Sequence, residues 1–365
     1  MVEASQLPEG TIRLPAELLR EFTSTAFSAV GVPQLDADLV ADVLVSADLR
    51  GIRSHGVARI EFFLVRIERG LINTRPQMTY RAGTDTTGLL EADGGIGIVA
   101  AERAMTEAIV MAERHGAGFV AVTNSSHFGY AGYWSMLAME QGCIGIAMSN
   151  SGRRAAPTFG SESLLGTNPI SVALSGGAGR TPFVLDMATT AVAVGKIETA
   201  LREDRPITEG WLLDQEEPPH LDERGILSFD TPLLPLGGAG DNTGGHKGYG
   251  LALLVELLCG ALAGEDLSAP IAGASADDVS AMGHFMGAIR VSGFRSEELV
   301  HTDMEASFDI LRRGKKERGR DRVFIHGEPE SAAEQANLKD GIPITPAVRR
   351  RLQHIDHHLG LGFEL

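Results

Sequence analysis

Residues 87–123, TGLLEADGGIGIVAAERAMTEAIVMAERHGAGFVAVT, decide the fold class of this chain. The short apolar segments at 87–92 and 118–123 predict two strands, and the segment 98–115 between them repeats apolar residues at helical spacing. Glycines stand at both turns. A strand, a helix and a strand in this order are typical of a layered α/β domain.

Helices and strands also alternate in the sequence on the C-terminal side of this unit. Helical segments at both ends of the chain flank this α/β middle, so we predict a helical domain from residues 1–75 with about 296–365, and an α/β domain at 76–295. The Pro-, Gly- and acid-rich residues 203–245 predict a long loop or lid, and 265–279 a mobile segment. We expect further strands at 144–148, 169–174, 183–187 and 285–291, and helices at 14–30, 35–50, 57–69, 133–141, 188–202 and 248–263.

Composition limits the class of protein. The 365 residues are enough for two domains, and a hydrophobic content of 43% with 44 glycines is typical of an α/β protein. The net charge of −16 argues against a nucleic-acid partner. The chain shows neither an apolar run of membrane-spanning length nor a signal peptide, and Cys143 and Cys259 lie in apolar runs that suit reduced thiols. We therefore expect a cytoplasmic protein with no membrane partner.

The segment Ser54-His55-Gly56-Val57-Ala58-Arg59 is the first candidate site. If a helix begins here, Ser54 is its N-cap, and His55 and Arg59 share one face as an i, i+4 pair. Arginine fits a carboxylate with two hydrogen bonds, and histidine exchanges a proton near neutral pH. Together they suit a small 2-oxo or 2-hydroxy acid. Taken alone, these six residues favour an ordinary helix start with a solvated arginine.

The segment Gly95-Ile96-Gly97-Ile98-Val99-Ala100 matches the dinucleotide fingerprint G-x-G-x-x-G/A between a strand and a helix. The acidic residue expected about 20 positions later is missing, since the next strand ends at Thr123-Asn124-Ser125. We therefore interpret these glycines as a tight turn between a strand and a helix.

Several other polar segments follow predicted strands or begin predicted helices. His127 follows a strand and is either a ligand contact or a packed loop histidine. Asp186 lies between a strand and a helix and is either part of an anion site or an N-cap. Lys247, in a glycine-rich helix start, suits a phosphate. His354, His357 and His358 lack complementary ligands, so we predict no metal site.

Together these motifs resemble the malate/L-lactate dehydrogenase family over about residues 12–330. The resemblance implies an NAD(P)-dependent oxidoreductase acting on 2-oxo acids or cyclic imino acids. It also implies a non-Rossmann, layered α/β cofactor domain and a homodimer whose active site lies between domains. The residues that carry it are Ser54-His55-Gly56-x-x-Arg59, Ser126-His127-Phe128-Gly129, Ser149-Asn150-Ser151, Leu165-Gly166-Thr167-Asn168-Pro169, Asp186-Met187-Ala188-Thr189, Gly195-Lys196, His246-Lys247-Gly248-Tyr249-Gly250-Leu251 and Gly283-His284-Phe285.

The resemblance also implies roles for individual residues. It identifies His55 as the proton donor in reduction, supported by Ser54, with His127 as the reserve candidate. Arg59 and Thr167 are implied as substrate contacts. The cofactor, NAD or NADP, is implied to contact a larger set, namely His127, Phe128, Gly129, Ser151, Asp186, Met187, Ala188, His246 and Lys247.

The chain departs from the family pattern in places that affect its substrate. Arg153 and Arg154 stand where relatives usually have small or apolar residues; they either bind a second acidic group of the substrate or lie at the dimer surface. Lys196 stands where the imine-reducing branch has a carboxylate, which favours a 2-hydroxy or 2-oxo acid substrate. The alternative functions are a cyclic imino-acid reductase and a non-catalytic dinucleotide-binding sensor.

Overall fold

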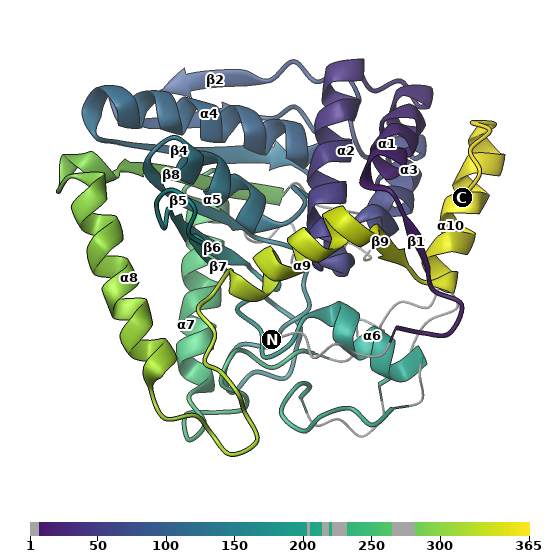
Figure 1. The fold of residues 1–365 in the computed structure, drawn as a ribbon. Coiled ribbons are helices and arrows are strands. Elements are labelled where there is room, and N and C mark those ends of the chain that lie inside the picture. The colour runs from purple at the N-terminus through teal and green to yellow at the C-terminus, as the bar shows by residue number, and fades with distance from the viewer. Residues whose placement is uncertain (1–6, 203–204, 214–218, 221–231, 265–281) are drawn as a thin grey trace.

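A seven-stranded mixed sheet lies at the centre of the computed structural model, which describes residues 7–202, 205–213, 219–220, 232–264 and 282–365 (Figure 1). The strand order is β2-β3-β4-β8-β5-β6-β7. Only β3 and β4 pair in parallel; every other named pair is antiparallel. The strands are β2 (Thr79–Ala82), β3 (Thr87–Glu91), β4 (Ala117–Ser125), β5 (Cys143–Ser149), β6 (Ile170–Leu174), β7 (Phe183–Met187) and β8 (Met282–Arg290).

The position of β8 determines where the loops after β4 and β5 begin. Because β8 pairs antiparallel with both β4 and β5, these two strands run in the same direction on either side of it. Their last residues, Ser125 and Ser149, therefore lie at the same edge of the sheet. Neighbouring strands are about 4.8 Å apart, so the two loops that follow begin about 10 Å from each other.

Helices cover both faces of the sheet. Helices α4 (Gly97–His115) and α5 (Ala131–Glu140) pack against β4, β5 and β8 on one face. Met286 and Ala288 of β8 belong to the large core on that side, whereas Phe285, one position along, packs with Cys259. Since side chains alternate along a strand, α7 (Gly245–Glu256) and the π-helical turn Leu257–Ala261 cover the opposite face.

The two ends of the chain meet in a helical layer. The first short strand pairs antiparallel with the last one, and Leu14 lies opposite Ile342. Phe22, Phe27 and Phe63 from this layer are fully buried in the same core as Trp134 of α5. The elements of the layer are β1 (Ile12–Leu14), α1 (Ala16–Ala29), α2 (Gln34–Leu49), α3 (Ile60–Glu68), α9 (Glu328–Asp340), β9 (Ile342–Ile344) and α10 (Pro346–Leu359).

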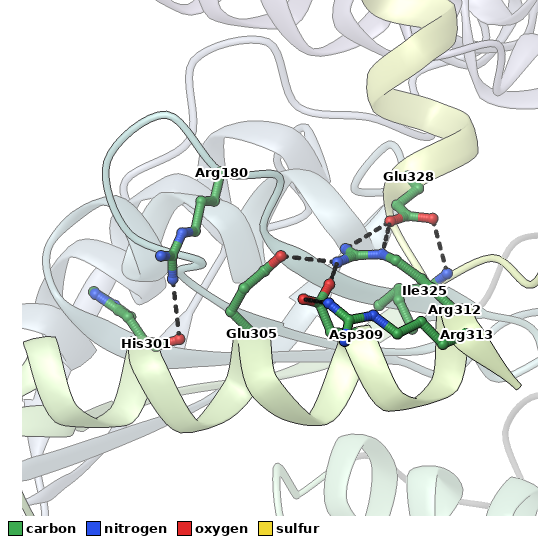
Figure 2. A network of polar contacts seen from close by, with 8 residues as sticks. All are labelled: Arg180, His301, Glu305, Asp309, Arg312, Arg313, Ile325 and Glu328. Atoms are coloured by element: carbon green, nitrogen blue, oxygen red, sulfur yellow. Dashed lines mark hydrogen bonds and ion pairs between the residues drawn. The ribbon is translucent and has the colours of Figure 1, made fainter.

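Helix α8 (Glu297–Arg313) has no buried residue of its own; it stacks Phe308 on Phe183 of β7 and makes several polar contacts. Figure 2 shows Arg312 donating to Glu328 at the start of α9 over 2.8 and 3.0 Å and to Glu305 over 2.8 Å. Arg180 donates to the carbonyl oxygen of His301 over 3.4 Å. The network joins α8 to α9 and to the turn between β6 and β7.

Most predicted elements are confirmed, with two corrections. The helix predicted over 188–202 is only α6 (Val194–Arg202), and the helix predicted from 57 begins at Ile60. The predicted segment 265–279 lies outside the described residues, as does much of 203–245. The division into two domains stays a prediction. None of the described helices is long and apolar enough to cross a bilayer.

Candidate active site

A buried carboxyl group packs against the loop that carries His55 and accepts a hydrogen bond from it. Asp48, at the end of α2, is 5% exposed and accepts a 2.7 Å hydrogen bond from the amide of Val57. Gly56 lies directly against it, and a Cβ atom there would collide with the Asp48 carboxyl. Burial raises the pKa of Asp48 to about 7. The loop therefore owes its conformation to a tertiary contact.

The prediction that Ser54, His55 and Arg59 lie at the start of an α-helix is wrong. His55 and Arg59 lie in two successive 3₁₀ turns, Arg53–His55 and Val57–Arg59, and no side chain caps either turn. Ser54 instead lies 2.9 Å from His55, hydroxyl oxygen to Nδ1, and its carbonyl oxygen accepts from Arg59 Nε over 2.7 Å. The three residues are thus joined, although not as an N-cap and a helical i, i+4 pair.

His127 joins this group from the loop after β4. Its ring stacks on that of His55, with centroids 5.5 Å apart and planes inclined by 30°. The edges of Phe62 and Phe63 enclose it. The amide of Gly129 donates to Nδ1 of His127 over 3.1 Å, so the proton of the neutral ring is on Nε2.

Both imidazoles are neutral at neutral pH. Burial, with the positive charge of Arg59 nearby, lowers the pKa of His55 to about 3. Burial also lowers the pKa of His127 well below its usual value, and His55 and Arg59 add to that shift. A cavity of about 60 Å³ adjoins His127 and is lined by polar groups of Arg66, Asn124 and other residues.

The turn at Gly95 and Gly97 supports the His127 loop. The hydroxyl of Ser126 donates to the Gly95 carbonyl over 3.0 Å and accepts from the Gly97 amide over 2.9 Å. A Cβ atom at position 97 would collide with the carbonyl group of Ser126. The structure thus gives these glycines a packing role, as predicted from the missing acidic residue.

His284 lies in a motif that carries the family resemblance, but the sequence analysis gave it no role in the site. It is fully buried on β8 and lies 2.9 Å from the hydroxyls of both Ser125 and Ser149. Ser149 donates its own proton to the Asn150 carbonyl, so it accepts from Nδ1, and Ser125 donates to Nε2. Burial lowers the pKa of His284 to about 3. This neutral ring joins the strand ends that precede the His127 and Ser151 loops.

The structure also brings together Ser151, an expected cofactor contact, and Thr167, an expected substrate contact. Their hydroxyl oxygens are 3.3 Å apart, and the Thr167 amide donates to the Ser151 hydroxyl over 3.0 Å. The Thr167 carbonyl accepts from the Thr189 amide over 2.9 Å. Farther along that segment, a Cβ atom on Gly195 would lie 3.5 Å from the Ser54 side chain. These contacts connect the Thr167 side of the site with the His55 loop.

The remaining predicted cofactor contacts lie in two other places. Asp186, at the end of β7 with Met187 and Ala188 after it, accepts a 2.9 Å hydrogen bond from Gly132 near the start of α5. It caps α5 and not the helix that follows it, and burial raises its pKa to about 6. His246 and Lys247 are exposed in the first turn of α7. Whether these residues contact a cofactor stays a prediction.

Arg153 has an unusual environment. It follows Ser151 in the loop after β5, and its Nε and Nη2 atoms are both shielded from solvent. Neither atom has a hydrogen-bond partner within the part of the chain that the structure describes. Buried guanidinium nitrogens are normally paired, because leaving them unpaired costs free energy. Arg153 therefore keeps two buried donors without a partner in the described part of the chain.

Two acidic residues that accept hydrogen bonds from the loops of the site are only weakly indicated by the sequence. Glu256 is the one charged residue in the apolar segment 251–263, and Asp48 precedes the His55 loop in an otherwise ordinary helix end. A lone acid in an apolar helix indicates a buried polar contact. Nothing local indicates which residues it contacts.

The chain is similar to known dehydrogenases over nearly its whole length. Malate dehydrogenase from Pyrococcus abyssi is 38% identical over 366 residues and matches 100% of both chains. L-sulfolactate dehydrogenase from Methanocaldococcus jannaschii is 35% identical, with 98% of both chains covered. The structure of malate dehydrogenase from Pyrococcus horikoshii superposes with a TM-score of 0.86 at 35% identity over 99% of both chains. Other relatives are named as NAD(+)- or NADP(+)-dependent dehydrogenases.

The family model described as malate/L-lactate dehydrogenase matches residues 14–353, which is nearly the whole chain. The chain therefore belongs to the malate/L-lactate dehydrogenase family.

Proposed function

We propose that this protein is a nicotinamide-dependent dehydrogenase that interconverts a small 2-hydroxy acid and its 2-oxo acid. The observation that carries the proposal is the group formed by His55, His127 and Arg59, in which two neutral imidazoles stack beside a guanidinium. Arg59 provides a partner for the substrate carboxylate, and the imidazoles serve the oxygen on C2.

The hydrogen bonds favour different roles for the two histidines. The amide of Gly129 occupies Nδ1 of His127, so its Nε2–H can only donate to the substrate oxygen. His55 has its Nδ1 beside the Ser54 hydroxyl; when Nδ1–H donates to that oxygen, Nε2 is free to accept the proton of the hydroxyl group. His55 is then the base in oxidation and, once protonated, the acid in reduction.

The first turn of α7 fits the phosphates of a dinucleotide. Its N-cap is Gly244, at φ 90°, which provides no side-chain cap, and His246 and Lys247 are exposed in this turn. NAD or NADP, when bound, supplies or accepts the hydride at C2. Asp186, Met187 and Ala188 stay predicted cofactor contacts, as do Phe128 and Gly129. The homodimer, the non-Rossmann cofactor domain and the cytoplasmic location also stay predictions.

The substrate that this site favours has a second acidic group. Nε and Nη2 of Arg153, which have no hydrogen-bond partner among the described residues, lie on the loop that presents Ser151 to Thr167. A carboxylate or sulfonate on C3 of a 2-oxo acid would complete their hydrogen bonds, because both anions accept from a guanidinium fork. This assignment agrees with relatives named for malate and sulfolactate.

The test is oxidation of NADH and NADPH, followed by absorbance, with oxaloacetate, sulfopyruvate, pyruvate and a cyclic imine as substrates. We expect Arg153→Gln to lower kcat/KM for the two dianionic acids about 10- to 100-fold, the range for losing a hydrogen bond to a charged group, and to leave pyruvate nearly unchanged. Arg154→Gln is the matched control. We expect it to lower kcat/KM selectively neither for the dianionic acids nor for pyruvate.

Each alternative predicts a different result. Equal losses for pyruvate and oxaloacetate in Arg153→Gln would remove Arg153 from the substrate site. Turnover of the cyclic imine alone would make the enzyme an imino-acid reductase. Coenzyme binding without turnover of any compound would favour the non-catalytic sensor.

A further inference from the structure

Glu256 makes two polar contacts that tie α7 to the site. It is the last residue of α7, directly before the π-helical turn, and its side chain is partly buried. Its Oε1 accepts from the amide group of Asn150 over 3.1 Å, and its Oε2 accepts from that of Asn168 over 2.9 Å. One carboxylate therefore holds two loops, one after β5 and one before β6.

Backbone groups determine the orientation of both amides. The amide N–H of Gly283 donates to Oδ1 of Asn150 over 2.9 Å, and that of Ser151 donates to Oδ1 of Asn168 over 3.3 Å. Each asparagine must therefore turn its NH₂ group toward position 256. Only a carboxylate offers an acceptor oxygen to both, because a glutamine would place its own NH₂ against one of them.

The side chains that Glu256 holds are adjacent to a predicted cofactor contact, Ser151, and a predicted substrate contact, Thr167. Asn150 precedes Ser151, and Asn168 follows Thr167; the hydroxyl oxygens of Ser151 and Thr167 are 3.3 Å apart. Asn168 is fully buried and adopts φ 38°, a left-handed conformation that asparagine tolerates better than most residues. The same helix α7 begins with His246 and Lys247.

We propose that Glu256 is a positioning residue, and that its negative charge is required because it must accept from two amides at once. It aligns Ser151 and Thr167 with one another and with α7, so it determines how the substrate is held and not how its proton moves. This inference rests on the proposed function for its kinetic test.

The first experiment is Glu256→Gln. We expect kcat/KM for the best 2-oxo acid to fall about 10- to 100-fold, mainly through KM, since a hydrogen bond to a charged group is lost. The pH dependence of kcat/KM should not change, because the His55–His127 pair is untouched. A merely structural role would lower the unfolding midpoint and leave the KM of the folded enzyme unchanged.

The decisive experiment exchanges donors and acceptors. In Asn150→Asp with Glu256→Gln, the new aspartate still accepts from the Gly283 amide and now also accepts from the glutamine NH₂. The glutamine oxygen still accepts from Asn168. We therefore expect this double variant to recover kcat/KM to within about threefold of wild type, since every hydrogen bond has a partner again.

The matched control is Asn168→Asp with Glu256→Gln. Asn168 also donates to the Ala252 carbonyl over 2.9 Å, so an aspartate at 168 would put an oxygen against that carbonyl. This double variant should not recover. Recovery in both double variants, or wild-type KM in Glu256→Gln, would overturn the proposal.

Failure of the proposed function can be distinguished from failure of this inference. If the wild-type protein turns over none of the substrates, the proposed function fails. The unfolding midpoints of Glu256→Gln and of the two double variants then test whether position 256 must offer two acceptor oxygens. The coenzyme affinities of the same variants test whether Glu256 positions the site. An order in which only the Asn150→Asp double variant regains the wild-type midpoint and affinity supports the inference; any other order contradicts it.

Discussion

The imidazole of His55 has consequences for the pH dependence of catalysis. Its pKa is lowered to about 3 by burial and by Arg59, so the free enzyme carries the neutral base at any pH well above that value. The pH profile of kcat/KM reports groups in the free enzyme. For oxidation of the 2-hydroxy acid, we expect kcat/KM to stay level through the ordinary histidine range, without a decrease as the pH falls through about 6.5. Initial rates measured from neutral to acid pH, with recovery of activity checked at neutral pH, test this.

The two histidine variants provide the control. His55→Gln removes the proton acceptor and should lower kcat at least about 100-fold, the usual minimum contribution of general acid–base catalysis. His127→Gln retains an N–H donor and should keep the level pH profile at a smaller loss. A decrease of kcat/KM near pH 6.5 in the wild type, or a larger loss of kcat in His127→Gln than in His55→Gln, would contradict the assignment of His55 as the base and His127 as the donor.

At this scale the sequence indicated the candidate groups for substrate and cofactor contact but not the residues that hold them. His55, His127, Ser151 and Thr167 all lie in motifs, and the structure joins them in the pairs described above. Glu256 and His284 act through contacts with residues 106 and 159 positions away, and Asp48 through a contact with Val57, nine positions along the chain. Single-sequence patterns carry no information about such contacts.

Among the elements, the junction of β3 and α4 is the one most closely packed against the site. Because a Cβ atom at Gly97 would collide with the Ser126 carbonyl, Gly97→Ala must displace either α4 or the His127 loop. We expect a loss of about 1–3 kcal/mol of unfolding free energy and a lower kcat. Urea unfolding and steady-state rates measure both. Gly250→Ala, in α7 with open space around it, is the control and should be neutral or slightly stabilising.

Regular elements were predictable where the periodic signal was long. The helix expected at 98–115 is α4, and the strand expected at 183–187 has those bounds in the structure. The four-residue edge strand β2 was missed because so short a segment has little pattern to detect. The 3₁₀ turns at His55 were read as a helix because Asp48, and not local propensity, shapes them.

Across the whole molecule, one asparagine joins three segments that are distant in sequence. Asn337 of α9 is 8% exposed and donates to the carbonyls of Asp48 and Leu49 at the end of α2, while its oxygen accepts from Arg13. Asn337→Ala removes the buried donor to both carbonyls, of which that of Asp48 still accepts from the Gly51 amide, and we expect it to cost about 1–3 kcal/mol of unfolding free energy. Gln335 is exposed on the same helix, so Gln335→Ala should lower the unfolding free energy by less than about 0.5 kcal/mol, as surface substitutions usually do. Equal values for the two would contradict this account.

The central place of β8 has a consequence for how the protein is made. Strands β4 and β5 leave the ribosome early, yet the strand that separates them is not synthesised until residues 282–290. Until then each of them has an open edge able to pair with the wrong chain. The sheet can therefore close only late in synthesis, through contacts of long sequence separation, which makes folding slow. We expect the nascent chain to depend on chaperones that shield these edges during that interval.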